Sequence, residues 1–253
     1  MESRGNLVQH VRMTSIVLPF LGFACGALAQ AGSPPPRAGA AHVDHLILGI
    51  RDLDEGIRRF EERTGVRPMV GGAHPGRGTR NALASLGPGL YVEILAPQPS
   101  APDSGAVTAL GKLTDLSPFG WAVSVPDVDD ARRRLAGAGF GVSDVKPGSR
   151  ARPDGSLLAW KTFEIEKPTI AGVPFFIRWG DGSTHPSLDS PGGCRLEGLR
   201  VVTPDAEDLR RLLAALPLDV PAETGAPAGL DITLVCPKGT VSFSAAAAPS
   251  GPR

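Results

Sequence analysis

The sequence has no net charge and few cysteines. It contains 26 basic and 26 acidic residues among 253, and only three cysteines. Proteins that bind nucleic acid present a basic field to the phosphates, and this sequence has none. We therefore expect no nucleic-acid partner.

Sequence motifs of several large enzyme classes are also missing. The chain has no Gly-rich phosphate loop, no G-x-S-x-G turn for a serine nucleophile, no H-E-x-x-H and no paired-cysteine metal site. Each of these motifs places a specific reactive or binding group at a defined turn or helix face. We expect no nucleotide cofactor, and any metal site must be assembled from distant parts of the chain.

The N-terminus resembles a secretory signal rather than a part of the fold. Residues 16–29 are an uncharged run of 14 residues that ends in Ala-Leu-Ala and follows basic residues. The run is shorter than the ~20 residues that span a bilayer, and its end suits a signal peptidase. Pro19 argues against an apolar core helix, and Phe23 argues against a lipoprotein site at Cys25. We expect a signal peptide over residues 1–29.

A short linker and a nearly neutral mature chain would follow cleavage. Residues 30–41 are rich in Pro, Gly and Ala without periodicity, which predicts a disordered linker. Cleavage removes two arginines and one glutamate, so the mature chain keeps 26 − 2 = 24 basic and 26 − 1 = 25 acidic residues. We expect a periplasmic or secreted protein with no membrane partner.

Two cysteines remain after cleavage. An oxidising compartment permits a disulfide between Cys194 and Cys236. Both cysteines have apolar neighbours, so inert core thiols are an equally open reading.

The mature sequence contains an internal repeat. Three β-rich runs end at Asp52, Asp127 and Asp205, and an acidic residue follows each Asp three positions later. This pattern predicts an N-cap, and the apolar residues after it recur at helical spacing. The repeat distances are 127 − 52 = 75 and 205 − 127 = 78 residues. Because a solenoid repeat is much shorter, each unit must be a small subdomain.

Strand patterns fill the rest of each repeat. Residues 42–100 (unit one) and 117–186 (unit two) each predict a β-α-β-β-β order, and residues 194–244 (the third unit) predict a truncated β-α-β-β order. The fold class is therefore α+β. A sheet with one helix leaves its other face bare, so paired units would enclose a cleft.

The chain resembles the vicinal-oxygen-chelate superfamily, and within it the glyoxalase-like proteins. The resemblance is carried by "VDHLILGIRDLDEGI", "GGAHPGRGTRNALASLGPGLYVEILAP", "SRARPDGSLLAWK" and "PFFIRWGDGSTHP", within a domain over residues 42–253. It implies repeated βαβββ units around a shared cleft. The implied activities are broad, from isomerases, dioxygenases and transferases to proteins that sequester a drug, so the fold alone does not fix the function.

The resemblance implies catalytic and metal-binding roles for His45 and Glu93. Members of the superfamily carry a metal-binding histidine on the first strand of a unit and a glutamate on the last. Strand alternation places His45 on the same face as Ile47 and turns Asp44 to the opposite face. A carboxylate between Val92 and Ile94 needs compensation if it is buried. The alternatives are a hydrogen-bonded core histidine and a glutamate paired with an arginine such as Arg80.

Unit two departs from the superfamily pattern. Trp121 stands where His45 stands, and Ile177 or Arg178 stands near the place of Glu93, so unit two supplies no metal ligand there. We expect a third ligand from a histidine that precedes a proline, His185 or His74. The predicted metal set is His45, Glu93 and His185, with a divalent ion as the cofactor.

Arginines in loops and strands near the predicted cleft indicate recognition of an anion. An arginine side chain binds a carboxylate or phosphate through two parallel hydrogen bonds. Tryptophans would supply apolar walls. Besides Arg77, Arg150, Trp160 and Trp179, which share these features, the predicted substrate-binding residues are His74, Arg80, Asn81, Trp121, Arg152 and Arg178.

Two hypotheses follow. The first is an exported metal-assisted enzyme of glyoxalase-like type, with lyase, isomerase or dioxygenase chemistry on a small anionic or oxygen-rich molecule. The second is a metal-free protein that binds or sequesters a small molecule in the same cleft. The pair of His45 and Glu93 favours the first, whereas Trp121 and Arg178 favour the second.

Overall fold

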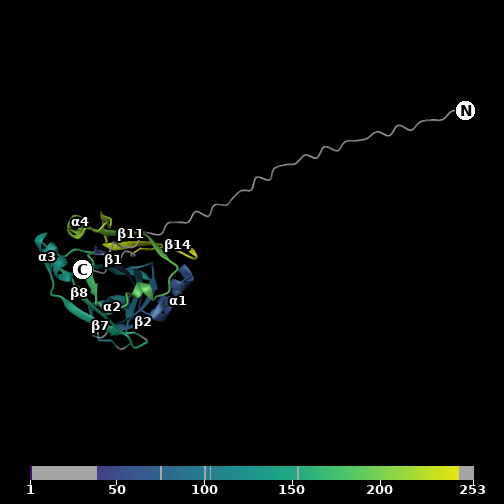
Figure 1. The fold of residues 1–253 in the computed structure, drawn as a ribbon, viewed down its shortest axis with the longest axis horizontal. Helices are drawn as coiled ribbons and strands as arrows, with labels where there is room; N and C mark the ends of the chain where they lie inside the picture. Colours follow the sequence, from purple (N-terminus) through teal and green to yellow (C-terminus); the bar gives the residue numbers. More distant parts are fainter. Residues whose placement is uncertain (2–38, 75, 100, 103, 153, 245–253) are drawn as a thin grey trace. The chain divides into compact units, whose positions relative to one another are not determined.

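The computed structural model describes residue 1 and residues 39–244, except 75, 100, 103 and 153. The predicted signal peptide and most of the predicted linker lie outside the described residues. Unit one has one helix and four strands: β1 (His42–Gly49), α1 (Leu53–Thr64), β2 (Met69–His74), β3 (Thr79–Ser85) and β4 (Tyr91–Pro97). Figure 1 labels β1, α1 and β2.

The first helix has the ends that its sequence predicts. The side chain of Asp52 accepts a hydrogen bond from the backbone N–H of Glu55 at 2.9 Å. At the other end Gly65 adopts φ 81°, a left-handed conformation that glycine reaches without steric cost. The buried face of α1, which includes Leu53, Ile57 and Phe60, packs against the sheet.

Unit two repeats this order with small additions. Helix α2 (Gly105–Gly111) precedes it. Its elements are β5 (Ser117–Ser124), α3 (Val128–Gly137), β6 (Gly141–Val142), β7 (Lys146–Ala151), β8 (Leu157–Phe163), β9 (Ile165–Lys167) and β10 (Phe175–Trp179). The short strands β6 and β9 pair with each other, and Asp127 caps α3 by accepting from the N–H of Asp130 at 2.7 Å.

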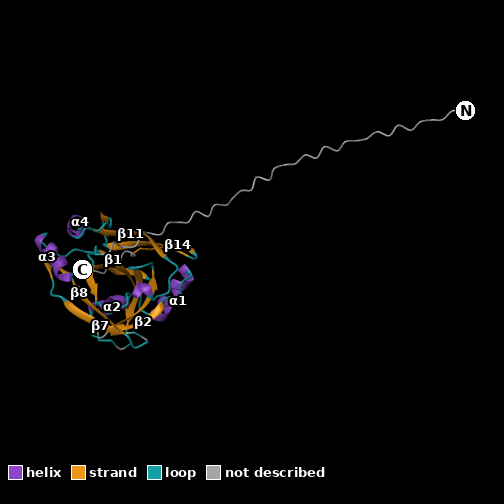
Figure 2. Cartoon of the chain, in the orientation of Figure 1, coloured by secondary structure: helices purple, strands orange, loops and turns teal. Residues whose placement is uncertain are grey.

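Both units belong to one eight-stranded sheet. The strand order is β2-β3-β4-β1-β5-β10-β8-β7, so the two units meet where β1 pairs antiparallel with β5. Within each unit the first and last strands are parallel neighbours, β1 with β4 and β5 with β10. The edge strands β2 and β7 also contact each other. The predicted α+β class is confirmed, with strands in the majority (Figure 2).

The third unit forms a separate sheet. It follows the 3₁₀ helix η1 (Pro186–Leu188), and its strand order is β12-β11-β13-β14. Its elements are β11 (Arg195–Thr203), α4 (Ala206–Ala215), β12 (Ala222–Thr224), β13 (Gly229–Cys236) and β14 (Gly239–Ser244). Strand β12 is absent from the sequence-based prediction.

The predicted cap at Asp205 is wrong. This side chain makes no capping bond to α4 and instead accepts from the N–H of Ala171 at 2.9 Å. Its carboxylate therefore ties unit two to the third unit, a use that local helix signals do not reveal.

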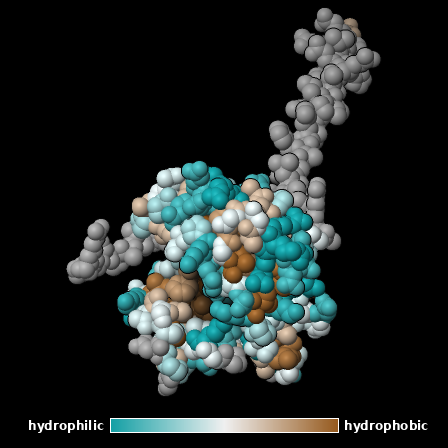
Figure 3. Space-filling view, turned by 90° about the vertical axis from the view of Figure 1, so that its left-hand side faces the viewer, coloured by the Kyte–Doolittle hydropathy of each residue, from teal (hydrophilic) through white to brown (hydrophobic). Residues whose placement is uncertain are grey.

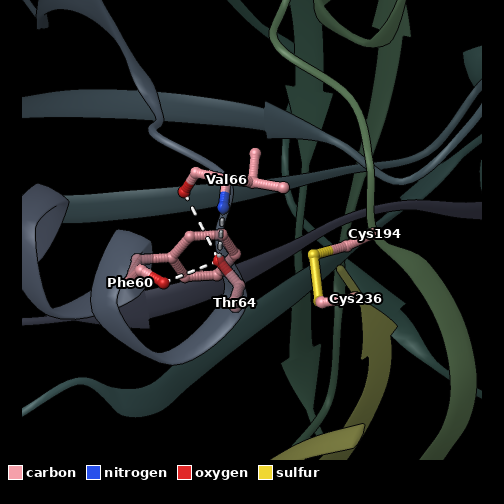
Figure 4. Close-up of a disulfide and its surroundings, with 5 residues drawn as sticks. All are labelled: Phe60, Thr64, Val66, Cys194 and Cys236. Atoms are coloured by element: carbon pink, nitrogen blue, oxygen red, sulfur yellow. Dashed lines mark hydrogen bonds between the residues drawn. A yellow bond between two sulfur atoms is a disulfide. The ribbon is translucent and has the colours of Figure 1, made fainter. Parts of the chain in front are cut away.

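A disulfide joins Cys194 to Cys236 beside the end of α1 (Figure 4). In the same view the hydroxyl of Thr64 donates to the carbonyl of Phe60 at 2.6 Å and accepts from the N–H of Val66 at 3.1 Å. The disulfide reading of the two cysteines holds in the structure.

One hydrophobic core extends from unit one through unit two to the third unit. Phe60 of α1 stacks on Phe243 of β14 with ring centroids 6.1 Å apart. On the face shown in Figure 3, hydrophobic side chains gather in hollowed parts that hydrophilic ones border. Among the described residues, no helix is long and apolar enough to cross a membrane.

Candidate functional site

The eight-stranded sheet surrounds a cleft of about 640 Å³, and each of its strands contributes lining residues. This volume suits a small organic molecule. Polar groups gather mainly from unit one: His45, His74, Thr79, Asn81, Tyr91 and Glu93. Arg150, Thr162 and Glu164 of unit two also line the cleft.

A bulge in β1 sets the position of Asp44. The register between β1 and β5 shifts between Val43 and His45, so regular strand alternation breaks at this point. The expectation that Asp44 turns away from His45 is therefore wrong. Asp44 Oδ1 lies 2.7 Å from His45 Nδ1, and both side chains are buried.

The second oxygen of Asp44 receives two bonds from unit two and the segment after it. Trp179 Nε1 donates to Asp44 Oδ2 at 3.0 Å, and His185 Nε2 lies 3.2 Å from the same oxygen. His185 Nδ1 accepts from the N–H of Ser187 at 3.2 Å, so its proton sits on Nε2 and points to Asp44.

Asp44 is an ionised carboxylate inside the protein. Burial alone would raise its pKa, but the hydrogen bonds from His185 and His45 outweigh burial and hold the pKa of this carboxyl well below its usual range. Because an ionised carboxylate only accepts, His45 Nδ1 carries a proton. When the ring carries this one proton, its lone pair is on Nε2, which is directed at Glu93.

Glu93 lies between two histidines and an amide. His45 Nε2 is 3.7 Å from Glu93 Oε2, and His74 Nε2 is 3.6 Å from Glu93 Oε1. Asn81 Nδ2 donates to Glu93 Oε1 at 2.6 Å. The side chains of His45 and Glu93 thus point toward each other from the neighbouring strands β1 and β4.

His74 accepts from Asn81 and donates to Thr79. Its Nε2 is 3.2 Å from Asn81 Nδ2, which can only donate, so the proton of the neutral ring is on Nδ1, 2.9 Å from Thr79 Oγ1. Burial lowers the pKa of His74, with Glu93 opposing this effect and Arg150 adding to it. His74 is thereby kept neutral.

Tyr91 lies beside the imidazole ring of His45. Its ring stacks on His45 with centroids 4.7 Å apart, and Phe175 meets His45 edge-on at 5.4 Å. Burial raises the pKa of Tyr91 well above its ordinary value, and the charges of Asp44 and Glu93 act in the same direction. The phenol therefore stays protonated and can donate a hydrogen bond to a ligand.

Unit two supplies apolar walls. Trp121, Trp160, Trp179, Phe175 and Ile177 all line the cleft. The indole N–H groups of Trp121 and Trp179 are directed to protein acceptors, Trp121 to the carbonyl of Gly172 at 2.8 Å.

The cleft gathers some of the predicted site residues and leaves others outside it. His45, Glu93, His74, Asn81 and Trp121 line the cleft. The predicted site residues outside its lining are His185, Arg80, Arg152 and Arg178.

The side chains outside the cleft have local roles in the structure. Arg152 pairs with Asp189 and donates to the carbonyl of Thr184, and Arg178 pairs with Asp181 at 2.8 Å. His185 holds Asp44, as described above. Among the described residues, Arg80 forms no ion pair with Glu93. Asn81 donates a hydrogen bond to this carboxylate instead.

Among the described residues, the site as arranged offers no set of three ligands to a divalent ion. Residues 39–244, within the described ranges, hold no group of three or more His, Cys, Asp or Glu side chains arranged to bind a metal. His185 is directed at Asp44, and both Glu93 Oε1 and His74 Nε2 accept from Asn81 Nδ2. A cation bound by Glu93 Oε1 and His74 Nε2 would have to displace the amide of Asn81, so only His45 Nε2 and Glu93 Oε2 face each other without an N–H between them.

Sequence reasoning missed two residues of the site. Asp44 was given no role because a regular strand would turn it away, although its place directly before His45 was a signal. Tyr91, the only tyrosine of the chain, is two residues from Glu93 on the same strand and shares its face.

The fold and cleft define a class, namely the paired βαβββ units of the vicinal-oxygen-chelate superfamily. A family model described as "Glyoxalase-like domain" matches residues 43–217. The chain belongs to this glyoxalase-like family. No curated protein matches the chain.

Solved structures match the chain at low sequence identity. A hypothetical protein from Staphylococcus aureus is 16% identical with a TM-score of 0.58, over 83% of this chain and 87% of that one. Streptomyces coelicolor methylmalonyl-CoA epimerase, in complex with 2-nitronate-propionyl-CoA, is 17% identical with a TM-score of 0.40, over 56% and 96%. A 4-hydroxymandelate synthase mutant from Streptomyces coelicolor is 16% identical with a TM-score of 0.43, over 82% and 62%.

Proposed function

We propose that this protein is an exported enzyme that binds a small anionic or oxygen-rich molecule in the cleft and moves a proton at a carbon next to a carbonyl. The observation that carries the proposal is the 2.7 Å bond between Asp44 and His45, which leaves His45 Nε2 as an acceptor facing the cleft. A base positioned in this way removes a proton most effectively when its tautomer is fixed.

The proton transfer uses groups of unit one. His45 Nε2 takes the proton from carbon, and the electron pair of that C–H bond moves toward the carbonyl oxygen to give an enolate. Tyr91, whose pKa is raised by burial, is the neutral donor available to that oxygen. Return of the proton to the same carbon gives exchange with solvent, and its delivery to the neighbouring atom by the imidazolium completes an isomerisation.

Glu93 gives the site its second proton acceptor. Its Oε2 lies 3.7 Å from His45 Nε2, and its Oε1 is fixed by Asn81. A carboxylate at this place stabilises the imidazolium that forms when His45 takes a proton. The catalytic residues of the proposal are therefore His45 and Glu93.

A non-catalytic binding protein is the second candidate. The apolar wall of unit two, including Trp160 and Phe175, favours it, because such a surface holds a flat molecule without chemistry. Metal-assisted chemistry with His45, Glu93 and a third histidine needs the amide of Asn81 to leave its present place, because that amide now satisfies the carboxylate.

Export is part of the proposal. Support comes from the N-terminal apolar run and from the Cys194–Cys236 disulfide, since disulfides persist in oxidising compartments. N-terminal sequencing of the protein recovered from its native host tests this point. A mature chain that begins near Gln30 supports export, and a full-length cytoplasmic protein contradicts it.

The activity is tested by solvent exchange. We would incubate the purified protein in D₂O with hydroxyacetone, mandelate or methylmalonate and follow the C–H signal by proton NMR. We expect enzyme-dependent loss of this signal for at least one compound and a decrease of about 100- to 10,000-fold in His45→Gln.

His42→Gln is the matched control, because His42 lies on the same strand outside the cleft lining. We expect it to exchange at the wild-type rate. Absence of exchange with all three compounds, or equal rates in the His45 and His42 variants, would reject the proposed activity and leave the binding candidate.

A further inference from the structure

Arg150 is a buried cation without a carboxylate partner. It lies on β7 of unit two, lines the cleft and is 4% exposed. Its Nη1 donates to the carbonyl of Gly71. Among the described residues, no carboxylate oxygen lies within the 4.0 Å of an ion pair from its guanidinium.

A buried guanidinium without a carboxylate partner has neither the solvation of water nor an opposite charge beside it. It remains charged when buried, and a buried charge is costly unless it is paired. Burial lowers the pKa of Arg150, while the charge of Glu93 acts against this effect. Glu93 is already engaged by Asn81 and flanked by two histidines.

The backbone of Gly71 packs closely against Arg150. Gly71 on β2 faces it, and a Cβ at position 71 would lie 3.0 Å from Arg150 Nη2 and 2.4 Å from Asn81 Oδ1. That buried amide oxygen has no hydrogen-bond partner among the described residues. Arg150 and Asn81 therefore both lie against the backbone of Gly71, where β2 and β7 contact each other, and both line the cleft.

We infer that Arg150 binds a carboxylate of the ligand, so that the ligand is a small carboxylic acid with an apolar body. The guanidinium supplies parallel N–H donors that match the two oxygens of a carboxylate. The aromatic walls of unit two take the apolar part. This inference rests on the proposed function only in placing the ligand in the same cleft as His45.

The three tryptophans of the chain report on binding. Trp121, Trp160 and Trp179 all line the cleft, so a ligand there changes the intrinsic fluorescence. We would titrate benzoate and its neutral analogue benzamide at constant ionic strength, with excitation at a wavelength that selects tryptophan. We expect wild type to bind benzoate at least about tenfold more tightly than benzamide.

Variants assign the preference to one side chain. Arg150→Gln keeps a neutral N–H donor, and we expect it to lose about 10- to 100-fold in benzoate affinity with little change for benzamide. Arg150→Lys keeps the charge without the planar fork and should retain part of the affinity. Arg152→Gln is the matched control, because Arg152 pairs with Asp189 outside the cleft lining, and should bind as wild type does.

The inference is overturned if benzoate and benzamide bind wild type equally, if neither binds, or if the Arg150 and Arg152 variants lose affinity alike. A thermal melt of Arg150→Gln that matches wild type assigns its loss of affinity to the missing charge. Solvent exchange without a carboxylate preference would reject this inference and keep the proposed function. A carboxylate preference without solvent exchange would keep this inference and reject the proposed function.

Discussion

Units one and two have the same strand order on either side of the β1–β5 contact, yet their inner faces differ. Strand β4 presents Tyr91, Glu93 and Leu95 to the cleft, and its counterpart β10 presents Phe175, Ile177 and Trp179. His45 of β1 likewise has Trp121 of β5 as its counterpart. The inner face of unit one is thus mainly polar, and that of unit two is mainly apolar, so the sheet has a polar half and an apolar half.

The two halves are joined by a few polar contacts across the division. Trp179 and the nearby His185 hold Asp44, which in turn orients His45. In the same way, Arg150 of unit two reaches Gly71 of unit one. The apolar half therefore helps to position His45 of the polar half, so neither half forms the cleft alone.

The first prediction tests whether the site formed by units one and two depends on the third unit. The Cys194–Cys236 bridge spans 42 residues, and a loop of this length corresponds to about 4 kcal/mol of chain entropy. We expect Cys194→Ser/Cys236→Ser to lower the free energy of unfolding by about that amount in a denaturant titration. Exchange and benzoate binding at 25 °C should stay within about twofold of wild type. If the variant is folded but has lost both exchange and benzoate binding, the third unit takes part in the site.

The second prediction tests whether Asp44, which is held by Trp179 and His185, positions His45. Asp44→Asn places an amide where two histidines and an indole now donate, and we expect exchange to fall about 10- to 100-fold. The pH profile of exchange should change, and nitrogen NMR should show a mixture of His45 tautomers. Asp54→Asn on the exposed side of α1 is the control. An unchanged tautomer with reduced exchange would assign Asp44 a purely structural role.

The third prediction concerns metal binding by the polar half. Asn81→Asp replaces the amide N–H between His74 and Glu93 by a second carboxylate. We expect Zn²⁺ affinity, measured by calorimetry, to increase by about tenfold or more, because ligand charge sets affinity for divalent ions. Asn81→Ala removes the amide without adding charge and should give a smaller increase. Tight binding of one Zn²⁺ by wild type would show that the amide does not exclude metal.

The fold could be predicted from sequence because its signals are local. The caps at Asp52 and Asp127 act over three residues, and both appear in the structure. Asp205 follows the same local pattern but bonds to Ala171, since a carboxylate near a helix start also finds partners across the fold. Local patterns predicted the helix there but not its cap.

From sequence, only those site residues could be predicted whose position on a strand determines where the side chain points. Resemblance gave roles to His45 and Glu93, and their side chains lie 3.7 Å apart in the structure. The bond between Asp44 and His45 depends on a bulge, and the direction of His185 depends on the loop that leads to η1. Neither geometry follows from residue spacing, because both depend on how distant segments pack.

The last prediction uses pH to test the burial of His74 in the polar half. Its pKa is lowered from 6.5 by burial, so the folded protein takes up this proton at lower pH than the unfolded chain does. As pH falls below about 6.5, the unfolded state binds more protons and the free energy of unfolding decreases. We expect His74→Gln to reduce the loss of stability between pH 7 and pH 5, measured by denaturant titration at each pH. His42→Gln should keep the wild-type slope, since His42 lies outside the cleft. A slope unchanged in His74→Gln would mean that His74 titrates alike in the folded and unfolded protein, and that burial does not hold it neutral.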